Sequence, residues 1–326
     1  MSISLDSQAI LLLCSQIGLI LNPEYKALTL RDWNPLAKSL QVAGMRPGNL
    51  LGMSTGDMVE GVGVSSEEAL RYAYLLQRSG ALAIELERLE SLGIFALTRA
   101  DKDYPKRYRQ RLKEAAPAVL FYAGDYALLG QPGIAVVGSR HLDEVGQACA
   151  EFVGNACGLS GKVLYSGGAR GVDTISMDAA LQSRGTAVGV LANSLETAIR
   201  HPAYREALGR GDLCFVTPYS PNASFSVGTA MGRNRLIYTL ADYAVVVASD
   251  AEKGGTWAGA TEALKAKWLP VFVLEHPAMP EGNKALIKKG GIPLPHPLPV
   301  GHEALSSWLE ENATNLDPDP EQLSFF

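Results

Sequence analysis

Short apolar runs alternate with amphipathic stretches from residue 94 onward, whereas the first 90 residues show only helical spacing. Several of these runs are apolar without a polar alternation, which is typical of strands buried on both faces of a sheet. The pattern predicts seven strands, at Val119–Tyr122, Ile134–Val137, Val163–Tyr165, Ala187–Leu191, Cys214–Thr217, Ala244–Ala248 and Val271–Leu274.

Stretches with helical spacing separate these runs, at Glu144–Cys157, Val172–Arg184, Ala203–Leu208, Asn234–Leu240 and Ala258–Lys267. Regular alternation of strand and helix is the pattern of a sheet whose strands are joined by helical crossovers. The sequence therefore predicts an α/β fold of the Rossmann-like kind, with a doubly wound and mainly parallel sheet.

We divide the chain into a helical N-terminal domain at 1–90, an α/β domain with the doubly wound sheet at 91–300, and a short helix with an acidic flexible tail at 301–326. In the first domain, Ser7 is a candidate helix cap, and Ser65 to Glu68 has the spacing of a capping box. Small helical units bind DNA backbone or partner proteins, or they serve for packing and dimerisation, and the sequence leaves both roles open.

Composition narrows the class of protein. The chain is 47% hydrophobic over 326 residues, which is enough to bury a substantial core. Its four cysteines form no CxxC pair and are accompanied by no histidine cluster, so we expect no metal site, no disulfide framework and a cytoplasmic location. The apolar run at 9–21 is too short to cross a bilayer, and we expect no membrane association.

The net charge of −5 neither supports nor excludes nucleic acid as a partner. Six acidic residues and no basic residue lie beyond position 289, and removing those six acids changes the net charge to +1. A nearly neutral body can still carry a basic groove, because the distribution of the charges matters more than their sum.

Glycine, arginine and small polar residues follow most of the predicted strands. Ligands of an open parallel sheet bind outside the carboxyl ends of its strands, where glycines expose backbone N–H groups and arginines offer paired donors to phosphate. Each loop alone also fits a tight turn, close helix packing or a surface ion pair. Together they form one candidate phosphate site: Gly138, Ser139, Arg140, Ser166, Gly167, Gly168, Arg170, Gly171, Asn193, Arg233, Asn234, Arg235, Gly254, Gly255, Thr256 and Lys284.

The motifs argue against catalysis and against a bound cofactor. The chain contains neither the dinucleotide fingerprint GxGxxG nor a Walker motif GxxxxGK[ST], and no serine or cysteine nucleophile stands in a recognisable triad order. We therefore assign no catalytic residue, no metal and no cofactor.

Three segments, in order, resemble the DprA/Smf DNA-processing family: Ala135–Arg140, Ser166–Asp173 and Arg233–Ile237, with Gly282–Lys284 similar to a late segment of that family. The resemblance covers residues 94–292. It implies an extended Rossmann-like fold, delivery of single-stranded DNA to the RecA recombinase during uptake or recombination, and the homodimer that is common in that family. It also implies that the DNA phosphates are bound by ten residues of the candidate site, which are Ser139, Arg140, Ser166, Gly167, Gly168, Arg170, Gly171, Arg233, Asn234 and Arg235.

An alternative function rests on a departure from that family. Gly254-Gly255-Thr256, followed by Glu262, stands where the family usually has Ser-Gly-Ser, and this arrangement is similar to the lysine-decarboxylase-like nucleotide hydrolases. A nucleotide sensor or hydrolase therefore stays open, with Glu262 as its candidate acid. We predict that Glu262 is not catalytic.

The C-terminus offers a candidate docking peptide. Gln322, Leu323, Phe325 and Phe326 resemble the short peptides that bind the bacterial sliding clamp, with Phe325 where leucine is usual. An acidic linker that contains proline keeps such a segment extended, and its apolar side chains fit a pocket of a partner. Packing of these side chains on their own domain is the alternative.

Overall fold

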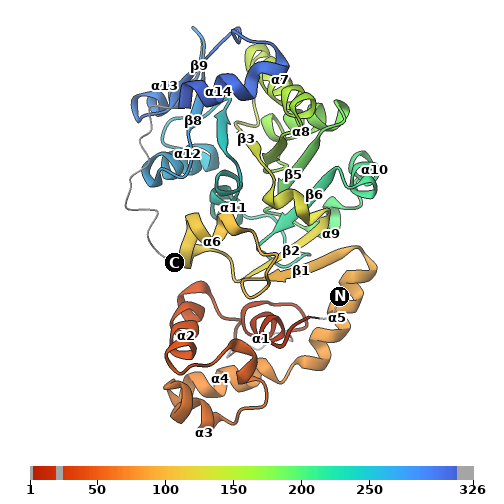
Figure 1. Ribbon diagram of the computed structural model, residues 1–326, viewed down its shortest axis with the longest axis vertical. Coiled ribbons are helices and arrows are strands. Elements are labelled where there is room, and N and C mark those ends of the chain that lie inside the picture. Colours follow the sequence, from red (N-terminus) through yellow and green to blue (C-terminus); the bar gives the residue numbers. More distant parts are fainter. Residues whose placement is uncertain (1–2, 20–24, 314–326) are drawn as a thin grey trace. The chain divides into compact units, whose positions relative to one another are not determined.

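The computed structural model describes residues 3–19 and 25–313 and divides into two compact units (Figure 1). The first unit holds Met1–Gly124, Asn193–His201 and Phe215–Ser224. The second unit holds Asp125–Ala192, Pro202–Cys214 and Phe225–Phe326. The boundary expected at residue 90 falls inside the first unit, and the division into domains at residues 90 and 300 stays a prediction.

Six parallel strands form the sheet of the second unit, in the order β5-β4-β3-β7-β8-β9. Their bounds are β3 Gly133–Val137, β4 Val163–Ser166, β5 Thr186–Val190, β7 Tyr243–Val246, β8 Val271–Glu275 and β9 Ile292–Pro295. The chain leaves β3 toward β4 and β5, and later returns to the other side of β3 with β7. The order of the strands thus reverses between β3 and β7, which is where doubly wound folds bind ligands.

Helices join these strands. Their bounds are η4 Tyr126–Gly130, α7 Glu144–Ser160, α8 Val172–Gln182, α10 Pro202–Arg210, α11 Val227–Leu240, α12 Gly254–Ala266, α13 Glu281–Lys288, η5 His302–Ala304 and α14 Leu305–Ala313. Helix α7 packs on α8, whereas α11 packs on α12 and α12 on α13. Figure 1 shows α7 and α8 on one side of β3 and α12 and α13 on the other, which is the layering of a doubly wound fold.

The first unit contains mostly helices. Their bounds are α1 Leu5–Cys14, α2 Leu30–Val42, η1 Pro47–Leu50, α3 Thr55–Asp57, η2 Met58–Val62, α4 Ser66–Leu76, α5 Ser79–Ser91, α6 Lys106–Leu112, η3 Lys113–Ala115 and α9 Leu195–Ala198. Two antiparallel strands, β1 (Ile94–Thr98) and β2 (Val119–Gly124), pair in register from Ile94 with Ala123 to Thr98 with Val119. Strand β6 (Leu213–Thr217) contributes residues to both units.

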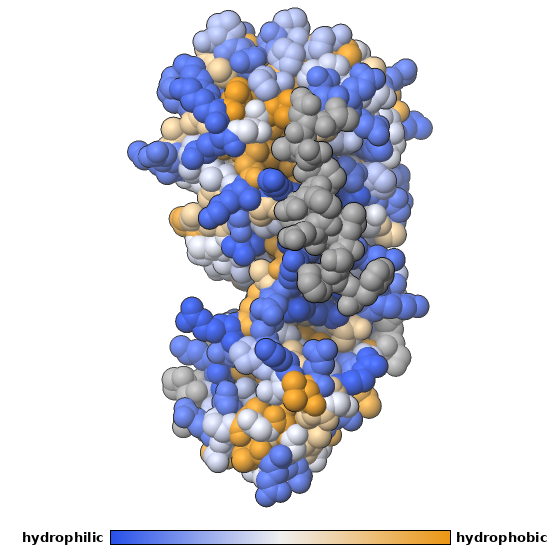
Figure 2. All heavy atoms as spheres, turned by 60° about the vertical axis from the view of Figure 1, so that its left-hand side comes forward, coloured by the Kyte–Doolittle hydropathy of each residue, from blue (hydrophilic) through white to orange (hydrophobic). Residues whose placement is uncertain are grey.

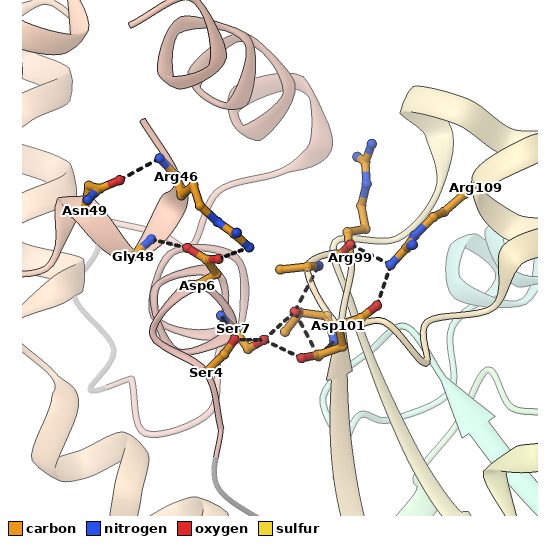
Figure 3. Close-up of polar contacts among 11 residues, drawn as sticks. Ser4, Asp6, Ser7, Arg46, Gly48, Asn49, Arg99, Asp101 and Arg109 are labelled. Carbon is orange, nitrogen blue, oxygen red and sulfur yellow. Dashed lines mark hydrogen bonds and ion pairs between the residues drawn. The ribbon is translucent and has the colours of Figure 1, made fainter. Parts of the chain in front are cut away.

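Helix α1 is tied to the turn after β1 by buried polar groups (Figure 3). Ser7 Oγ donates to Asp101 Oδ1 at 2.6 Å, and the backbone N–H of Thr98 donates to Asp101 Oδ2 at 2.7 Å. Ser4 caps α1 by accepting from Ser7 N, so the assignment of Ser7 as the cap is wrong. The capping box that the sequence predicts at Ser65 is confirmed.

All seven predicted strands are confirmed, and the described part of the chain contains two further strands, β1 and β9. Strand β9 contains Pro293 and Pro295. Proline has a low propensity for strands and occurs mainly in edge strands, so the sequence pattern did not predict this strand. Helix α11 begins at Val227, seven residues earlier than predicted, because a capping box of Ser226 and Thr229 starts it. Arg233, Asn234 and Arg235 therefore lie inside a helix and not at its start.

No helix among residues 3–19 and 25–313 is long and apolar enough to cross a membrane. Within the same ranges, no three His, Cys, Asp or Glu residues are grouped so that they could hold a metal ion. The predicted tail and its residues Gln322, Leu323, Phe325 and Phe326 lie outside the described residues.

Candidate nucleic-acid interface

A pocket of about 410 Å³ opens in the second unit where the strand order reverses. Its walls include Val137 and Gly138 at the end of β3, and Ala248 and Ser249 after β7. The backbone N–H of Ser139 donates to Ala248 O at 2.9 Å and so joins the two loops that leave these strands. The pocket therefore occupies the ligand position of a doubly wound sheet.

The loop after β4 supports the loop after β3. Gly171 has a φ of +90°, and a Cβ at this position would come within 2.5 Å of Ser139 O and 2.7 Å of Arg140 Cα. The backbone N–H of Val172 donates to the same Ser139 oxygen at 3.3 Å. Glycine is therefore required at 171 by both conformation and space, and the backbone of Arg140 is held in place by the start of α8.

Arg140 lies at the pocket wall and is exposed. Its guanidinium carbon lies 5.4 Å from the centre of the Phe225 ring, which is within the range of a cation–π contact. Phe225 is itself 51% exposed and lines the pocket. A ligand in the pocket therefore meets a cation and an aromatic ring side by side.

Arg233 lies deep in the pocket wall, with only 5% of its surface exposed. Its guanidinium lies over Gly167, where a Cβ would fall 1.6 Å from one terminal nitrogen and 2.5 Å from Asp173 Oδ2. Burial raises the pKa of Asp173 above its ordinary value, although the charge of Arg233 and the N–H groups of Ala169 and Gly167 act in the opposite direction. Asp173 therefore lies beside Arg233.

The first turn of α12 forms a further wall, from Lys253 to Thr256. Lys253 is the N-cap residue, it is exposed, and it makes no side-chain hydrogen bond to the helix. The first N–H groups of a helix lack partners within the helix and carry the positive end of its dipole. This wall therefore offers backbone donors and a lysine charge to an anion.

Asn283 holds the loop that leads into this wall. It is fully buried, its side-chain oxygen accepts from Ser249 N at 2.9 Å, and its Nδ2 donates to Val247 O at 3.0 Å and to Leu274 O at 2.8 Å. The late Gly-Asn-Lys motif thus acts through Asn283, which fixes the end of β7. Its lysine, Lys284, pairs with Glu281 at 2.6 Å and does not line the pocket.

The pocket brings together eight of the predicted site residues, which are Gly138, Ser139, Arg140, Arg233, Asn234, Gly254, Gly255 and Thr256. Three other predicted residues lie behind the pocket wall. Gly167 lies against the guanidinium of Arg233, Gly171 lies against the backbone of Arg140, and the buried hydroxyl of Ser166 donates to Val136 O at 2.7 Å. Gly168 and the exposed Arg170 lie in the same loop but do not line the pocket. Asn193 belongs to the first unit.

Arg235 and Glu262 do not line the pocket either. Arg235 lies 3.5 Å from Glu262, and both side chains are partly exposed. An ion pair between α11 and α12 accounts for both residues. The acid on which the hydrolase alternative depends is therefore placed outside the pocket.

Sequence reasoning missed several residues that line the pocket: His141, Val227, Ala230, Met231 and Asp250. Val227 and Met231 stand four residues apart, a spacing that would have marked a helix face had the capping box before them been recognised. Tyr165 in β4 is fully buried, and its hydroxyl lies 2.7 Å from both Leu128 O and Gln131 O.

The sequence matches the family described as DNA recombination-mediator protein A over residues 95–296. Among curated proteins, it is 29% identical to protein Smf of Escherichia coli over 213 residues, which are 63% of this chain and 56% of that protein. It is 32% identical to the DNA processing protein DprA of Streptococcus pneumoniae over 143 residues, which are 43% of this chain and 49% of that protein. The chain thus spans about half the length of these relatives.

Two solved structures share the fold. DprA from Streptococcus pneumoniae superposes with a TM-score of 0.66 at 21% identity, over 94% of this chain and 98% of that one. DNA processing protein A from Helicobacter pylori superposes with a TM-score of 0.54 at 22% identity, over 68% of this chain and 97% of that one. The structure of that protein addresses its single-stranded DNA binding mode. These matches confirm the Rossmann-like fold. With the family match over most of the α/β region, they confirm the resemblance, and the chain belongs to the DNA recombination-mediator protein A family of DprA and Smf.

Proposed function

We propose that the pocket between β3 and β7 binds the backbone of single-stranded DNA, and that the protein processes DNA during recombination or uptake. The observation that carries this proposal is that three kinds of group able to donate hydrogen bonds to phosphate line one pocket. These are the exposed cations Arg140 and Lys253, the buried Arg233, and the first turn of α12. Arginine and helix N-termini are the groups that proteins use to contact phosphate oxygens.

Backbone recognition has a consequence for specificity. Phosphates carry no base identity, so affinity should vary little with sequence and should fall as salt rises, because binding releases counterions. We expect the same protein to bind oligonucleotides of mixed, thymine-rich and adenine-rich sequence with similar affinities at one salt concentration.

The test compares two arginines by fluorescence anisotropy over a series of salt concentrations. Arg140→Ala should weaken the binding of every oligonucleotide and lower the slope of log affinity against log salt by about one. Arg205→Ala is the matched control, because Arg205 is exposed on α10 of the same unit and lies outside the pocket. Equal affinities of a folded Arg140→Ala variant and the wild type would refute the proposal.

Delivery of the strand to the RecA recombinase, and formation of a homodimer, are finer parts of the same proposal and rest on family membership. RecA assembly on DNA coated with single-strand-binding protein should accelerate when this protein is added. Arg140→Ala should remove that acceleration. An unchanged rate of RecA assembly, when wild-type protein saturates the DNA, would refute delivery. Sedimentation at several protein concentrations tests the dimer.

Docking to the sliding clamp is a separate proposal, carried by the sequence of Gln322, Leu323, Phe325 and Phe326. A labelled peptide of the last ten residues should bind purified clamp weakly, because a short chain loses much conformational freedom on binding. Replacing Leu323 and Phe326 with alanine should remove that binding. Equal binding of the two peptides would exclude the clamp as the partner.

A further inference from the structure

Positive charge is concentrated in one short stretch of the first unit, which comprises the turn after β1 and helix α6. Residues 99–113 contain seven of the 29 basic residues of the chain and two acidic residues, a net charge of +5 in a protein whose overall charge is −5. Figure 2 shows a face of the molecule that is mostly hydrophilic and carries its apolar residues in a few patches. The proposed function does not use this basic stretch, because the pocket belongs to the second unit.

Helix α6 packs one side on the core and leaves a polar side exposed. Tyr108 and Leu112 are buried. The exposed side chains are those of Lys106, Arg109, Gln110 and the C-cap residue Lys113. Positions three, four and seven residues apart lie on one side of a helix, so these side chains share a face. That face carries three positive charges and no negative charge.

Arg109 joins this face of α6 to the turn after β1 (Figure 3). Its Nη2 donates to Arg99 O at 3.0 Å and also to Asp101 O. Its guanidinium carbon lies 5.4 Å from the centre of the Tyr104 ring, which is within the range of a cation–π contact. The turn and the helix therefore belong to one surface.

The turn adds a further positive charge to that surface. Asp101 accepts from Ser7 Oγ and from the backbone N–H of Thr98, so its carboxylate is used in the contact with α1. Lys102, the next residue, is exposed. We call the combined basic face the α6 surface, and it consists of Lys102, Lys106, Arg109 and Lys113.

The charges of the α6 surface do not stabilise the start of the helix. Lys106 and Arg107 stand in the first turn of α6, which contains no acidic residue and receives no side-chain cap. Cations at this end of a helix oppose its dipole, and like charges three or four residues apart repel each other. Within the described part of the chain, the side chains of Lys102, Lys106 and Lys113 make no hydrogen bond or ion pair. Stability therefore does not explain these lysines.

The lack of apolar side chains on the α6 surface indicates what kind of partner it fits. In the described part of the first unit, the large apolar residues that are exposed are Ile3, Leu5, Val42, Leu70 and Ile84, and none of these lies in the turn or on α6. Protein partners bind mainly through apolar and aromatic anchors at the centre of an interface. A nucleic-acid backbone is bound instead by lysine and arginine charges. The α6 surface therefore fits a nucleic acid better than an acidic protein.

We propose that the α6 surface is a second DNA-binding site, which lies on the first unit and holds the phosphate backbone of a single strand. This inference rests on the proposed function for the choice of partner, and it adds a contact outside the pocket. Lysines that contact phosphates release counterions, so the α6 surface should contribute to the salt dependence of binding.

The test measures the affinity for a long oligothymidine by fluorescence anisotropy at several salt concentrations. A triple variant, Lys102→Gln with Lys106→Gln and Lys113→Gln, removes three of the charges. Each phosphate contact of a single strand contributes about 0.7 to the slope of log affinity against log salt, so the triple variant should lower this slope by about two and weaken binding about tenfold or more at low salt. Arginine at the same three positions keeps the charge and should preserve both values.

The matched control is Lys265→Gln with Lys267→Gln and Lys288→Gln. These three lysines are exposed in the second unit and lie outside the pocket, and their replacement changes the net charge by the same amount. The control variant should keep the affinity and the slope of the wild type. Equal losses in the control and in the triple variant would show an effect of net charge alone and would overturn the α6 surface.

Arg140→Ala separates this inference from the proposed function. Failure of the wild type to bind the strand would refute both. Weaker binding by the triple variant, next to unchanged binding by Arg140→Ala, would support the α6 surface and refute the pocket. Weaker binding by Arg140→Ala, next to wild-type affinity and slope in a triple variant that urea unfolding shows to be folded, would refute the α6 surface alone.

Discussion

Gly167→Ala should remove Arg233 from its position in the pocket. A Cβ at residue 167 would fall 1.6 Å from a terminal nitrogen of Arg233, whereas an ordinary contact begins at 3.4 Å, so the guanidinium must move by about 1.8 Å. Arg233 is 5% exposed and has Asp173 beside it, which leaves little room for that movement. Overpacking of this kind costs about 1–3 kcal/mol of stability.

The same displacement should weaken DNA binding, because hydrogen bonds to phosphate depend on the position of the guanidinium. Loss of one hydrogen bond to a charged group corresponds to about 1.5–3 kcal/mol, or roughly tenfold or more in affinity. The assay is anisotropy with oligothymidine, next to urea unfolding to check that the variant is folded. Gly209→Ala is the control, since a Cβ at that position meets no atom within 4 Å. Wild-type affinity in a folded Gly167→Ala variant would refute the role of Arg233.

Three further variants test other parts of the account. Asn283→Ala should lower the free energy of unfolding by about 3 kcal/mol, because it leaves buried backbone groups without partners, whereas the exposed Asn312→Ala should change it by less than about 0.5 kcal/mol in urea titrations. Burial raises the pKa of Asp173 above its ordinary value of 3.8, so the folded protein binds the carboxyl proton more tightly than the unfolded chain does. The ionised carboxylate therefore lowers the free energy of unfolding as pH rises above 3.8. The stability of Asp173→Asn relative to wild type should therefore increase from acid to neutral pH, and a flat or declining difference would contradict the assignment. Wild-type protein should release no base from AMP or GMP, as followed by chromatography, and release that Glu262→Gln abolishes would restore the hydrolase alternative.

The strands of the second unit could be predicted because buried parallel strands are apolar without interruption. Helix α11 could be placed only in part, since Gly228 and Gly232 suggest a loop and the cap at Ser226 is completed by a threonine. The site was predicted as a set of loops at strand ends, and that principle places Arg140 and Gly254 at the pocket. That principle does not tell where a side chain points. Arg170 and Lys284 were therefore assigned to the site only because they lie close to other site residues in the sequence.

The environment of Arg233 required the fold. Its neighbours Gly167 and Asp173 are some sixty residues away in the chain, and only the packing of α11 beside the loop after β4 brings them together. The same holds for Asn283, whose three backbone partners lie at the ends of two strands. Sequence spacing identifies such residues as notable without saying whether they bind a ligand or hold a loop.

Cross-linking of a bound strand is the most direct test of where DNA lies. Oligothymidine that carries a photoreactive base should be irradiated in complex with the full chain, and the cross-linked peptides should then be identified by mass spectrometry. We predict cross-links to the segments 138–141, 225–234 or 253–256, each of which contributes residues to the wall of the pocket. Cross-links confined to the first unit, or to parts of the second unit outside these segments, would contradict it.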